Sequence, residues 1–168
     1  FDHCIIAAGS SSSVIPGIPF ENENVLTSKT ALDLKKIPKS LLVIGGGYIG
    51  LEMGTVFSAL GASVSVAEFL PNLLPGADPD LVKPLARKLK KEFNQILLST
   101  KITKVEESST GGLSVTMERD GKENIETYDQ VLVSVGRRPN TDKMGVNTTG
   151  IKVDKQGRKS FISKLLPI

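Results

Sequence analysis

Six consecutive residues, Gly45 to Gly50, have the spacing G-x-G-x-x-G, the pattern in this sequence best suited to chemistry. Each glycine in such a pattern has its own task. Gly45 makes a tight turn after a strand, Gly47 lets the backbone approach a pyrophosphate, and Gly50 lets the following helix pack closely. The start of that helix offers unpaired N–H groups to phosphates. The pattern alone is weak, because glycine-rich turns are common.

An acidic residue, Glu68, ends the next expected strand, 18 residues beyond Gly50. The usual spacing in dinucleotide-binding units is about 20 residues. A carboxylate at this place accepts hydrogen bonds from ribose hydroxyls and repels a 2′-phosphate, so it favours NAD over NADP. Hydrogen bonds to a charged group contribute about 1.5–3 kcal/mol, which is enough to influence the choice of cofactor. The alternative is a solvent-facing glutamate after a strand.

The elements around these residues alternate between strand and helix. The short apolar run at 41–44 is typical of a parallel strand buried on both faces. A predicted helix follows the glycines and ends at Gly61, the usual C-terminal position of glycine. The order predicts an α/β fold, a Rossmann-like doubly wound parallel sheet. The expected strands are 41–44, 62–68 and 96–98, and the expected helices are 49–60 and 78–93.

The pattern changes after residue 100. Strands are expected at 101–107, 113–119 and 124–127, joined by Gly111-Gly112 and Asp120-Gly121. Asp-Gly between two alternating strands is a hairpin signal. We therefore expect an inserted antiparallel β-meander that returns to the parallel sheet at 131–135.

The two ends of the chain suggest a piece of a longer protein. The opening Phe1–Gly9 matches Tyr128–Gly136 as an aromatic residue, Asp, a polar residue, aliphatic or small residues and then Gly. There is no initiator Met, and we interpret the two segments as crossover strands that join an inserted domain to another domain. The expected division is residues 1–40 as crossover strand and linker, with a short helix at 28–36, then 41–136 as the NAD-binding domain. Residues 137–168, loop-like past Asn140, form a return linker.

Four segments together carry a resemblance to a known family. Gly45–Gly54, Asp2–Ser10, Leu74–Asp78 and Gly136–Asn140 resemble the dihydrolipoamide dehydrogenases, a branch of the flavin-dependent pyridine nucleotide-disulfide oxidoreductases. The resemblance covers residues 1 to about 155 and corresponds to the family's central NAD domain. It implies a parent enzyme, a homodimer, that oxidises dihydrolipoamide through a redox disulfide and FAD and passes hydride to NAD. It further implies lipoyl domains of 2-oxo acid dehydrogenase complexes as partners, and the bacterial cytoplasm or mitochondrial matrix as location.

The same resemblance implies roles for individual residues. Glu68 would bind the ribose, Ile102 would pack on the adenine, and Gly136 would lie near the nicotinamide. The residues implied to touch FAD are Ala8, Gly9 and Ser10, and those implied to hold the pyrophosphate are Gly45, Gly46, Gly47, Tyr48, Ile49, Gly50 and Glu52.

Two of these residues leave an alternative open. Tyr48 is implied to be an aromatic gate over the flavin, or else an ordinary packing residue at the helix start. Glu52 is implied to pair with a lysine near the redox disulfide, or else to be an acid in the first helical turn, where the helix dipole favours it.

Composition excludes several classes of function. The net charge of +3, with one His and no aromatic-studded basic run, does not fit a nucleic-acid binder. No apolar run approaches the roughly 18 residues of a membrane span, and no metal-ligand cluster is present. The single Cys, Cys4, excludes an intramolecular disulfide and favours a reducing compartment. We expect Cys4 to be buried and inert and His3 to lie on the surface.

The absence of a second cysteine also excludes the family's redox pair from this chain, so no catalytic residue is assigned to it. Two alternatives remain. One is the NAD(P)-binding domain of a sibling reductase, of the glutathione or mercuric reductase type, which usually prefers NADP. The other is a free-standing, non-catalytic nucleotide-binding module.

Overall fold

The computed structural model describes residues 6–33, 35–142, 144–145, 148, 152–153 and 159–160. These residues form two compact units, one comprising Val14–Gly136 and the other the described residues up to Ser13 and from Arg137 onward. His3 and Cys4 lie outside the described residues, as does most of the segment 158–168. In the expected crossover strand at residues 1–9, the described part, 6–9, is not a strand.

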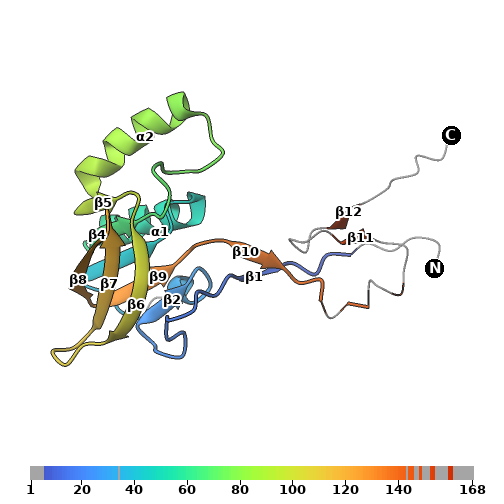
Figure 1. The fold of residues 1–168 in the computed structure, drawn as a ribbon, viewed down its shortest axis with the longest axis horizontal. Coiled ribbons are helices and arrows are strands. Elements are labelled where there is room, and N and C mark those ends of the chain that lie inside the picture. The colour runs from blue at the N-terminus through green and yellow to red at the C-terminus, as the bar shows by residue number, and fades with distance from the viewer. Residues whose placement is uncertain are drawn as a thin grey trace. The chain divides into compact units, whose positions relative to one another are not determined.

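A five-stranded parallel sheet forms the centre of the Val14–Gly136 unit (Figure 1). The central strand β3 follows a linker and pairs with β9 on one side and β4 on the other. This arrangement confirms the predicted α/β class with a Rossmann-like parallel sheet. In order across the sheet the strands are β2 (Val25–Thr27), β9 (Gln130–Val133), β3 (Ser40–Ile44), β4 (Ser63–Ala67) and β5 (Gln95–Leu97).

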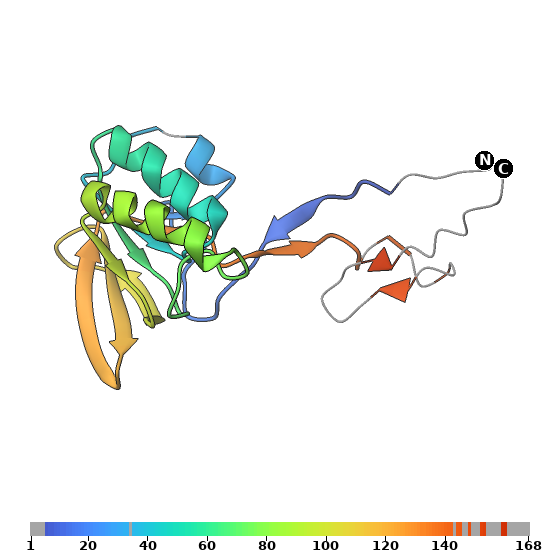
Figure 2. The ribbon, with the colours of Figure 1, turned by 90° about the horizontal axis from the view of Figure 1, so that it is seen from above.

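Two helices connect β3 to β4 and β4 to β5, and they lie along the same face of the sheet (Figure 2). Helix α1 spans Tyr48–Ala59 and is followed by Gly61 at φ +98°, the left-handed position expected after its end. Helix α2 spans Pro79–Glu92. Its N-cap Asp78 accepts a hydrogen bond from Asp80 N at 2.9 Å, which satisfies one of the free N–H groups at the helix start.

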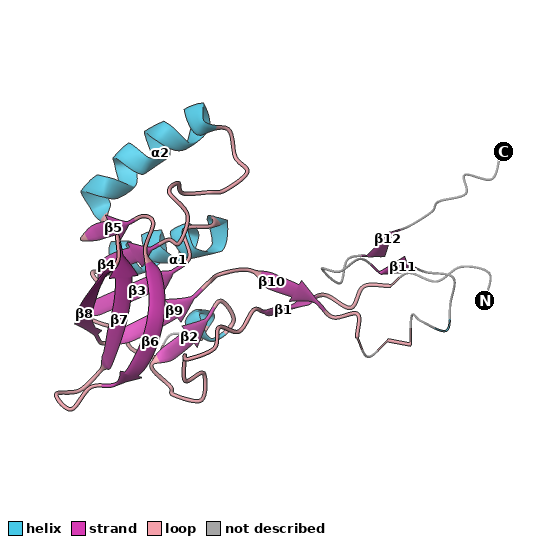
Figure 3. Ribbon diagram, in the orientation of Figure 1, coloured by secondary structure: helices cyan, strands magenta, loops and turns pink. Residues whose placement is uncertain are grey.

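The other face of the sheet is covered by the antiparallel meander (Figure 3). Its hairpin between the last two strands turns at Asp120 and Gly121, with φ of 51° and 71°. A two-residue hairpin turn of type I′ requires positive φ at both of its residues. The hairpin predicted from Asp-Gly is therefore confirmed. The strands are β6 (Lys101–Glu107), β7 (Leu113–Arg119) and β8 (Lys122–Tyr128).

Successive side chains of the parallel strands point to opposite faces of the sheet, and this divides the core into two clusters. In β3, Leu41 and Val43 face the helices, while Leu42 and Ile44 face the meander. All four are nearly inaccessible to solvent. This explains the continuous apolar run in the sequence, because a strand between two covered faces has no polar side.

Two sequence expectations are wrong in detail. The helix expected at 28–36 is a single 3-10 turn, η1 (Thr30–Leu32), which ends where Asp33, with ψ of 50°, leaves the helical conformation. Thr27 and Thr30 exchange hydrogen bonds between side chain and backbone N–H at its start. The segment past Asn140, expected to be loop-like, contains two short strands that pair antiparallel, β11 (Lys152–Val153) and β12 (Lys159–Ser160). A further strand, β10 (Arg137–Pro139), comes before it.

The second unit contains a two-stranded antiparallel ribbon of β1 (Ser10–Ser12) and β10. Arg137 holds the ribbon together, since its Nε donates to Ser10 Oγ at 2.8 Å and its Nη2 donates to Ser10 O at 2.6 Å. Asn140 extends the pairing, donating from its backbone N to Gly9 O and from Nδ2 to Ala8 O. The residues around Ser10 are thus tied to the segment that follows the parallel sheet.

A polar network joins the meander to the edge of the parallel sheet. The Tyr128 hydroxyl donates to Glu126 Oε2 at 2.6 Å, and Gln95 Nε2 donates to the same oxygen at 2.8 Å. Burial, followed by the hydrogen bond to Glu126, raises the pKa of Tyr128 from 10.0 to about 12. The folded state therefore favours the neutral phenol.

We predict that the unfolding free energy falls as the pH rises from 10 toward 12. Because the folded pKa lies above the unfolded one, the stabilisation is complete below pH 10 and disappears as Tyr128 ionises. A Tyr48→Phe variant leaves Tyr128 as the only tyrosine, so its ultraviolet titration reports this group alone. A midpoint near 10 in the folded protein would contradict the network, and Tyr128→Phe provides the baseline without the group.

Candidate dinucleotide-binding site

The glycine loop, Gly45–Gly50, joins the carboxyl end of β3 to the start of α1, as the sequence predicted. Gly45 has φ +108°, and a Cβ there would lie 2.7 Å from the backbone oxygen of Ser134. A Cβ on Gly50 would overlap the Gly45 carbonyl oxygen and lie 2.5 Å from Ser134 Oγ. Both positions therefore require glycine, for the turn and for the close approach of the helix.

Gly47 differs from its neighbours because the space beside it is open. A Cβ built on Gly47 meets no atom within 4 Å, and its φ of −77° is accessible to any residue. Gly47 is the N-cap of α1, with no side-chain cap, so the first N–H groups of the helix are left for another acceptor. An open surface beside unpaired N–H groups fits a phosphate ligand.

Glu68 follows β4 directly and lies next to the glycine loop. Only 7% of the residue is exposed, and both carboxylate oxygens accept backbone hydrogen bonds. Oε2 accepts from Gly46 N at 2.5 Å and Oε1 from Leu70 N at 2.8 Å. The alternative of a solvent-facing glutamate is therefore wrong. An ionised carboxylate has about four acceptor positions, so two remain for ribose hydroxyls.

Gly46 occupies an unspecified position of the pattern, yet neighbouring residues surround it closely. Its N–H is held by Glu68, and its carbonyl oxygen accepts from Leu74 N at 2.9 Å. A Cβ there would lie 2.7 Å from Leu73 Cδ2. The segment after Glu68 thus folds back over the loop, which the sequence pattern did not reveal.

Tyr48 and Glu52 both lie on the exposed surface of α1. Tyr48 is 65% exposed, so the alternative of ordinary packing does not hold for this residue within the described structure. Glu52 is the fifth residue of the helix, and the first turn contains no acid. The alternative of a first-turn acid is therefore wrong, because the helix begins one residue before its expected start. Ile49 between them is half-buried.

Ile102 lies at the start of β6, half-buried against the core cluster on the meander side. The chain just before it passes beside Glu68, because Thr100 N donates to Glu68 O at 2.9 Å. Gly136 is exposed, has φ +132°, and follows β9, the neighbour of β3. The glycine loop, Glu68 and the start of β6 therefore gather at the carboxyl ends of the parallel strands, the usual ligand edge of such sheets.

Ala8, Gly9 and Ser10 belong to the other unit, where they pair with the segment after Gly136. Ala8 and Gly9 are exposed there. Their backbone oxygens serve the ribbon described above.

Sequence reasoning missed Ser134, which follows β9 and touches the loop from the side opposite Glu68. Its hydroxyl lies 3.0 Å from Ile44 O and 3.2 Å from Gly45 O, close enough to donate to either. The available signal was a small hydroxyl residue directly after the apolar run 131–133, in the segment expected to return to the parallel sheet.

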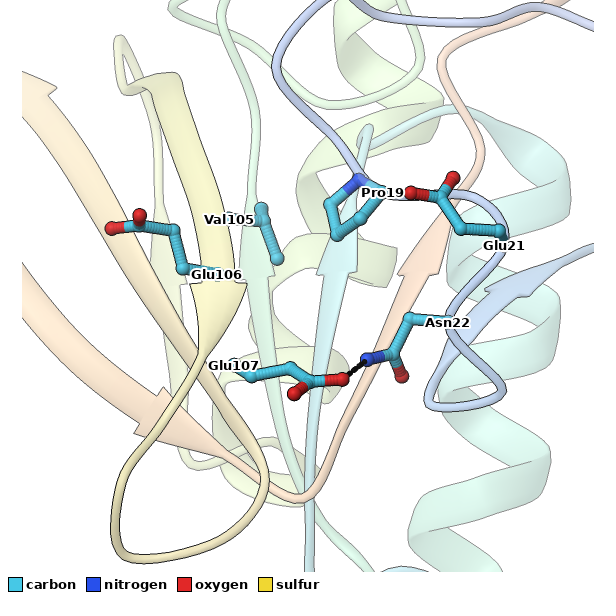
Figure 4. A pocket seen from close by; sticks show the side chains of 6 residues that line it. All are labelled: Pro19, Glu21, Asn22, Val105, Glu106 and Glu107. Carbon is cyan, nitrogen blue, oxygen red and sulfur yellow. Dashed lines mark hydrogen bonds between the residues drawn. The ribbon is translucent and has the colours of Figure 1, made fainter.

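A pocket elsewhere in this unit lies between the segment before β2 and strand β6 (Figure 4). Its Asn22 donates from Nδ2 to Glu107 Oε1 at 2.7 Å, and Asn22 O accepts from Val25 N at the amino end of β2. None of the predicted site residues lines this pocket. The lining residues are Pro19, Glu21, Asn22, Val105, Glu106 and Glu107.

Within the described ranges, no three His, Cys, Asp or Glu residues gather in a group that could hold a metal ion. None of the helices in the described part of the chain is long and apolar enough to cross a membrane.

Comparison with known proteins gives consistent matches. The family model of the pyridine nucleotide-disulphide oxidoreductases matches residues 1–164. Dihydrolipoyl dehydrogenase from Haemophilus influenzae is 43% identical over 94% of the chain, and the mitochondrial one from Dictyostelium discoideum is 43% identical over 92%. The HOCl-induced flavoprotein disulfide reductase RclA from Escherichia coli superimposes with a TM-score of 0.76 at 26% identity, covering 92% of this chain and 34% of its own.

The chain spans 32% of the length of each of these two dihydrolipoyl dehydrogenases. The fold, the glycine loop with Glu68 beside it, and a family match that covers nearly the whole sequence lead to one conclusion. This chain belongs to the pyridine nucleotide-disulphide oxidoreductase family.

Proposed function

We propose that this chain is the NAD-binding domain of a dihydrolipoyl dehydrogenase, a flavoprotein that oxidises dihydrolipoamide and passes hydride to NAD. The observation that carries the proposal is the pairing of an open Gly47 with a buried carboxylate, Glu68, at one edge of the sheet. The identity of the relatives supports this branch of the family over its siblings.

In this proposal different residues bind different parts of the dinucleotide. The loop Gly45–Gly50 and the start of α1 bind the pyrophosphate, where N–H groups and the helix dipole favour negative charge. Glu68 accepts hydrogen bonds from the adenosine ribose through its remaining lone pairs. Ile102 packs on the adenine, and Gly136 lies near the nicotinamide. We propose residues 41–136 as the binding domain, between linkers 1–40 and 137–168, with β2 of the first linker completing its sheet.

The FAD-facing residues are proposed to be Ala8, Gly9 and Ser10, with Tyr48 as a gate and Glu52 directed toward the flavin side. The exposure of Tyr48 and Glu52 leaves both side chains available for such contacts. When bound, FAD supplies the two-electron carrier between nicotinamide and a redox disulfide. The chain itself has a single Cys and contributes binding and orientation to this reaction.

The proposed parent enzyme is a homodimer that serves lipoyl domains of 2-oxo acid dehydrogenase complexes. The relatives include bacterial proteins and proteins described as mitochondrial. We accordingly propose the bacterial cytoplasm or the mitochondrial matrix as its location.

A sibling reductase that uses NADP is the competing candidate. A 2′-phosphate on the adenosine ribose would stand beside the Glu68 carboxylate and be repelled by it. The geometry at Glu68 therefore favours NAD over NADP.

Replacing Glu68 with Arg is expected to reverse the preference between the two cofactors. The wild type should bind NADH at least about tenfold more tightly than NADPH, because charge-assisted hydrogen bonds contribute about 1.5–3 kcal/mol. Calorimetric titration with each nucleotide at one fixed salt concentration measures both affinities.

The ratio of the two affinities is the decisive quantity. Glu68 also holds Gly46 and Leu70, so the variant weakens the loop for both nucleotides, and this common loss cancels in the ratio. Glu68→Gln removes the charge at similar size. It should bring the ratio of the NADH and NADPH affinities closer to one without reversing the preference. An unchanged ratio in Glu68→Arg would overturn the assignment of Glu68 as the selector.

Gly47→Ala is expected to weaken NADH binding about tenfold or more while leaving the chain folded. The added methyl meets no protein atom but occupies the space proposed for the pyrophosphate, and such overpacking typically costs 1–3 kcal/mol. Alanine also caps a helix less well than glycine, which lowers stability slightly. Calorimetric titration together with thermal unfolding separates the two effects.

Gly50→Ala is the matched comparison. Its methyl would overlap backbone at Gly45, so this variant should lose more stability than Gly47→Ala. Equal NADH affinity in Gly47→Ala and wild type would show that the pyrophosphate does not approach the loop there.

The isolated chain is expected not to oxidise dihydrolipoamide, even with added FAD and NAD. An internal redox disulfide needs two cysteines, and the chain has one. Absorbance of NADH at 340 nm follows the reaction. Turnover above a no-protein control would show that the chemistry resides in residues other than those assigned.

A further inference from the structure

We propose that Ser134 is a positioning residue of the dinucleotide loop, and that it acts with Glu68 to fix the peptide group between Gly45 and Gly46. The inference rests on the proposed NAD site. It concerns a residue outside the glycine pattern and follows from contacts on both sides of β3.

The peptide group between Gly45 and Gly46 is held at both of its polar ends. Its carbonyl oxygen, on Gly45, lies 3.2 Å from the Ser134 hydroxyl. Its N–H, on Gly46, donates to Glu68 Oε2. Ser134 follows β9 and Glu68 follows β4, the two strands that flank β3, so the peptide is held from both neighbouring strands.

Rotation of this peptide group would break both contacts at once. Two glycines in sequence offer the backbone many conformations, and Gly45 already has φ +108°. The Ser134 hydroxyl has one proton to share between Ile44 O and Gly45 O, so it ties the turn to the last residue of β3. We call the contacts of Ser134 and Glu68 with this peptide group the clamp. The clamp selects one backbone conformation from those available to the two glycines.

The selected conformation also determines the direction of the next N–H group. The Gly46 carbonyl accepts from Leu74 N, and in a trans peptide the following N–H points to the opposite side. The Gly47 N–H is thereby directed away from Leu74, at the residue whose surroundings are open. Ser134 acts through the loop backbone, and the pyrophosphate is the part of the ligand that depends on it.

The test compares Ser134→Ala with the matched control Ser63→Ala. Ser63 is an exposed strand residue whose side chain makes no hydrogen bond within the described residues. Without ligand, amide hydrogen exchange of Gly46, whose N–H donates to Glu68, is followed by NMR. We expect exchange at this amide to be several-fold faster in Ser134→Ala and unchanged in Ser63→Ala, with exchange in the strands the same in all three proteins.

With ligand, the affinities for NADH and for adenosine are measured on the same proteins. NADH binding should weaken about three- to tenfold in Ser134→Ala, the effect of one lost hydrogen bond. Adenosine, which has no phosphate, should bind as it does to the wild type. Unchanged loop exchange, or an equal loss for NADH and adenosine, would overturn the role of Ser134.

If the proposed function fails, the binding measurements on the wild type give a different result. If the wild type binds neither NADH nor adenosine, the NAD site is wrong, and the free-protein exchange alone decides the clamp. Faster exchange limited to Gly46 would then still support it, and unchanged exchange would overturn it.

Discussion

The structure depends on a place where three backbone segments meet with no room for a side chain. The turn after β3, the start of α1 and the end of β9 approach one another at Gly45, Gly50 and Ser134. This contact sets α1 against the sheet and so permits the helix-side core to close around Phe57 and Leu41. The same contact brings the helix N-terminus to the ligand edge. Packing and binding are therefore two results of one steric constraint.

Glu68 contributes both to the packing of the loop and to the proposed ligand binding. Its carboxylate satisfies two backbone N–H groups, which would otherwise be costly to bury. The carboxylate keeps acceptor capacity because each oxygen has more than one lone pair. A neutral or basic residue at this position would change the architecture of the loop as well as the charge beside the ribose. Cofactor preference in this site is therefore coupled to the conformation of the loop.

Much of the fold could be predicted because its signals are local. The apolar run of β3, the glycine at the end of α1 and the Asp120-Gly121 hairpin each follow from a few adjacent residues. Strand β10 could not be predicted in this way, since its partner β1 lies far away in the sequence. The length of η1 was also missed: the reciprocal bonds of Thr27 and Thr30 favour a helix start, but the backbone leaves the helical conformation at Asp33.

For the candidate site, spacing identified Glu68 and the glycines, whereas contacts made through folding were invisible. Ser134, Leu73 and Leu74 reach the loop from segments that no sequence pattern links to it. The role of Gly46 emerges only from these partners. Spacing thus locates the candidate binding residues, and tertiary structure shows what holds them.

The small strand β2 has a consequence for how this unit can be divided. Its three residues pair with β9 through Val25, Leu26 and Thr27, and Asn24 O accepts from Val131 N. A truncated protein that begins at residue 41 would leave β9 as an open edge with the apolar residues Val131, Leu132 and Val133. Exposed edges of this kind template pairing between molecules. The residues before β3 therefore cover the edge of β9, and a version of this unit shortened to residue 41 would expose an edge open to pairing between molecules.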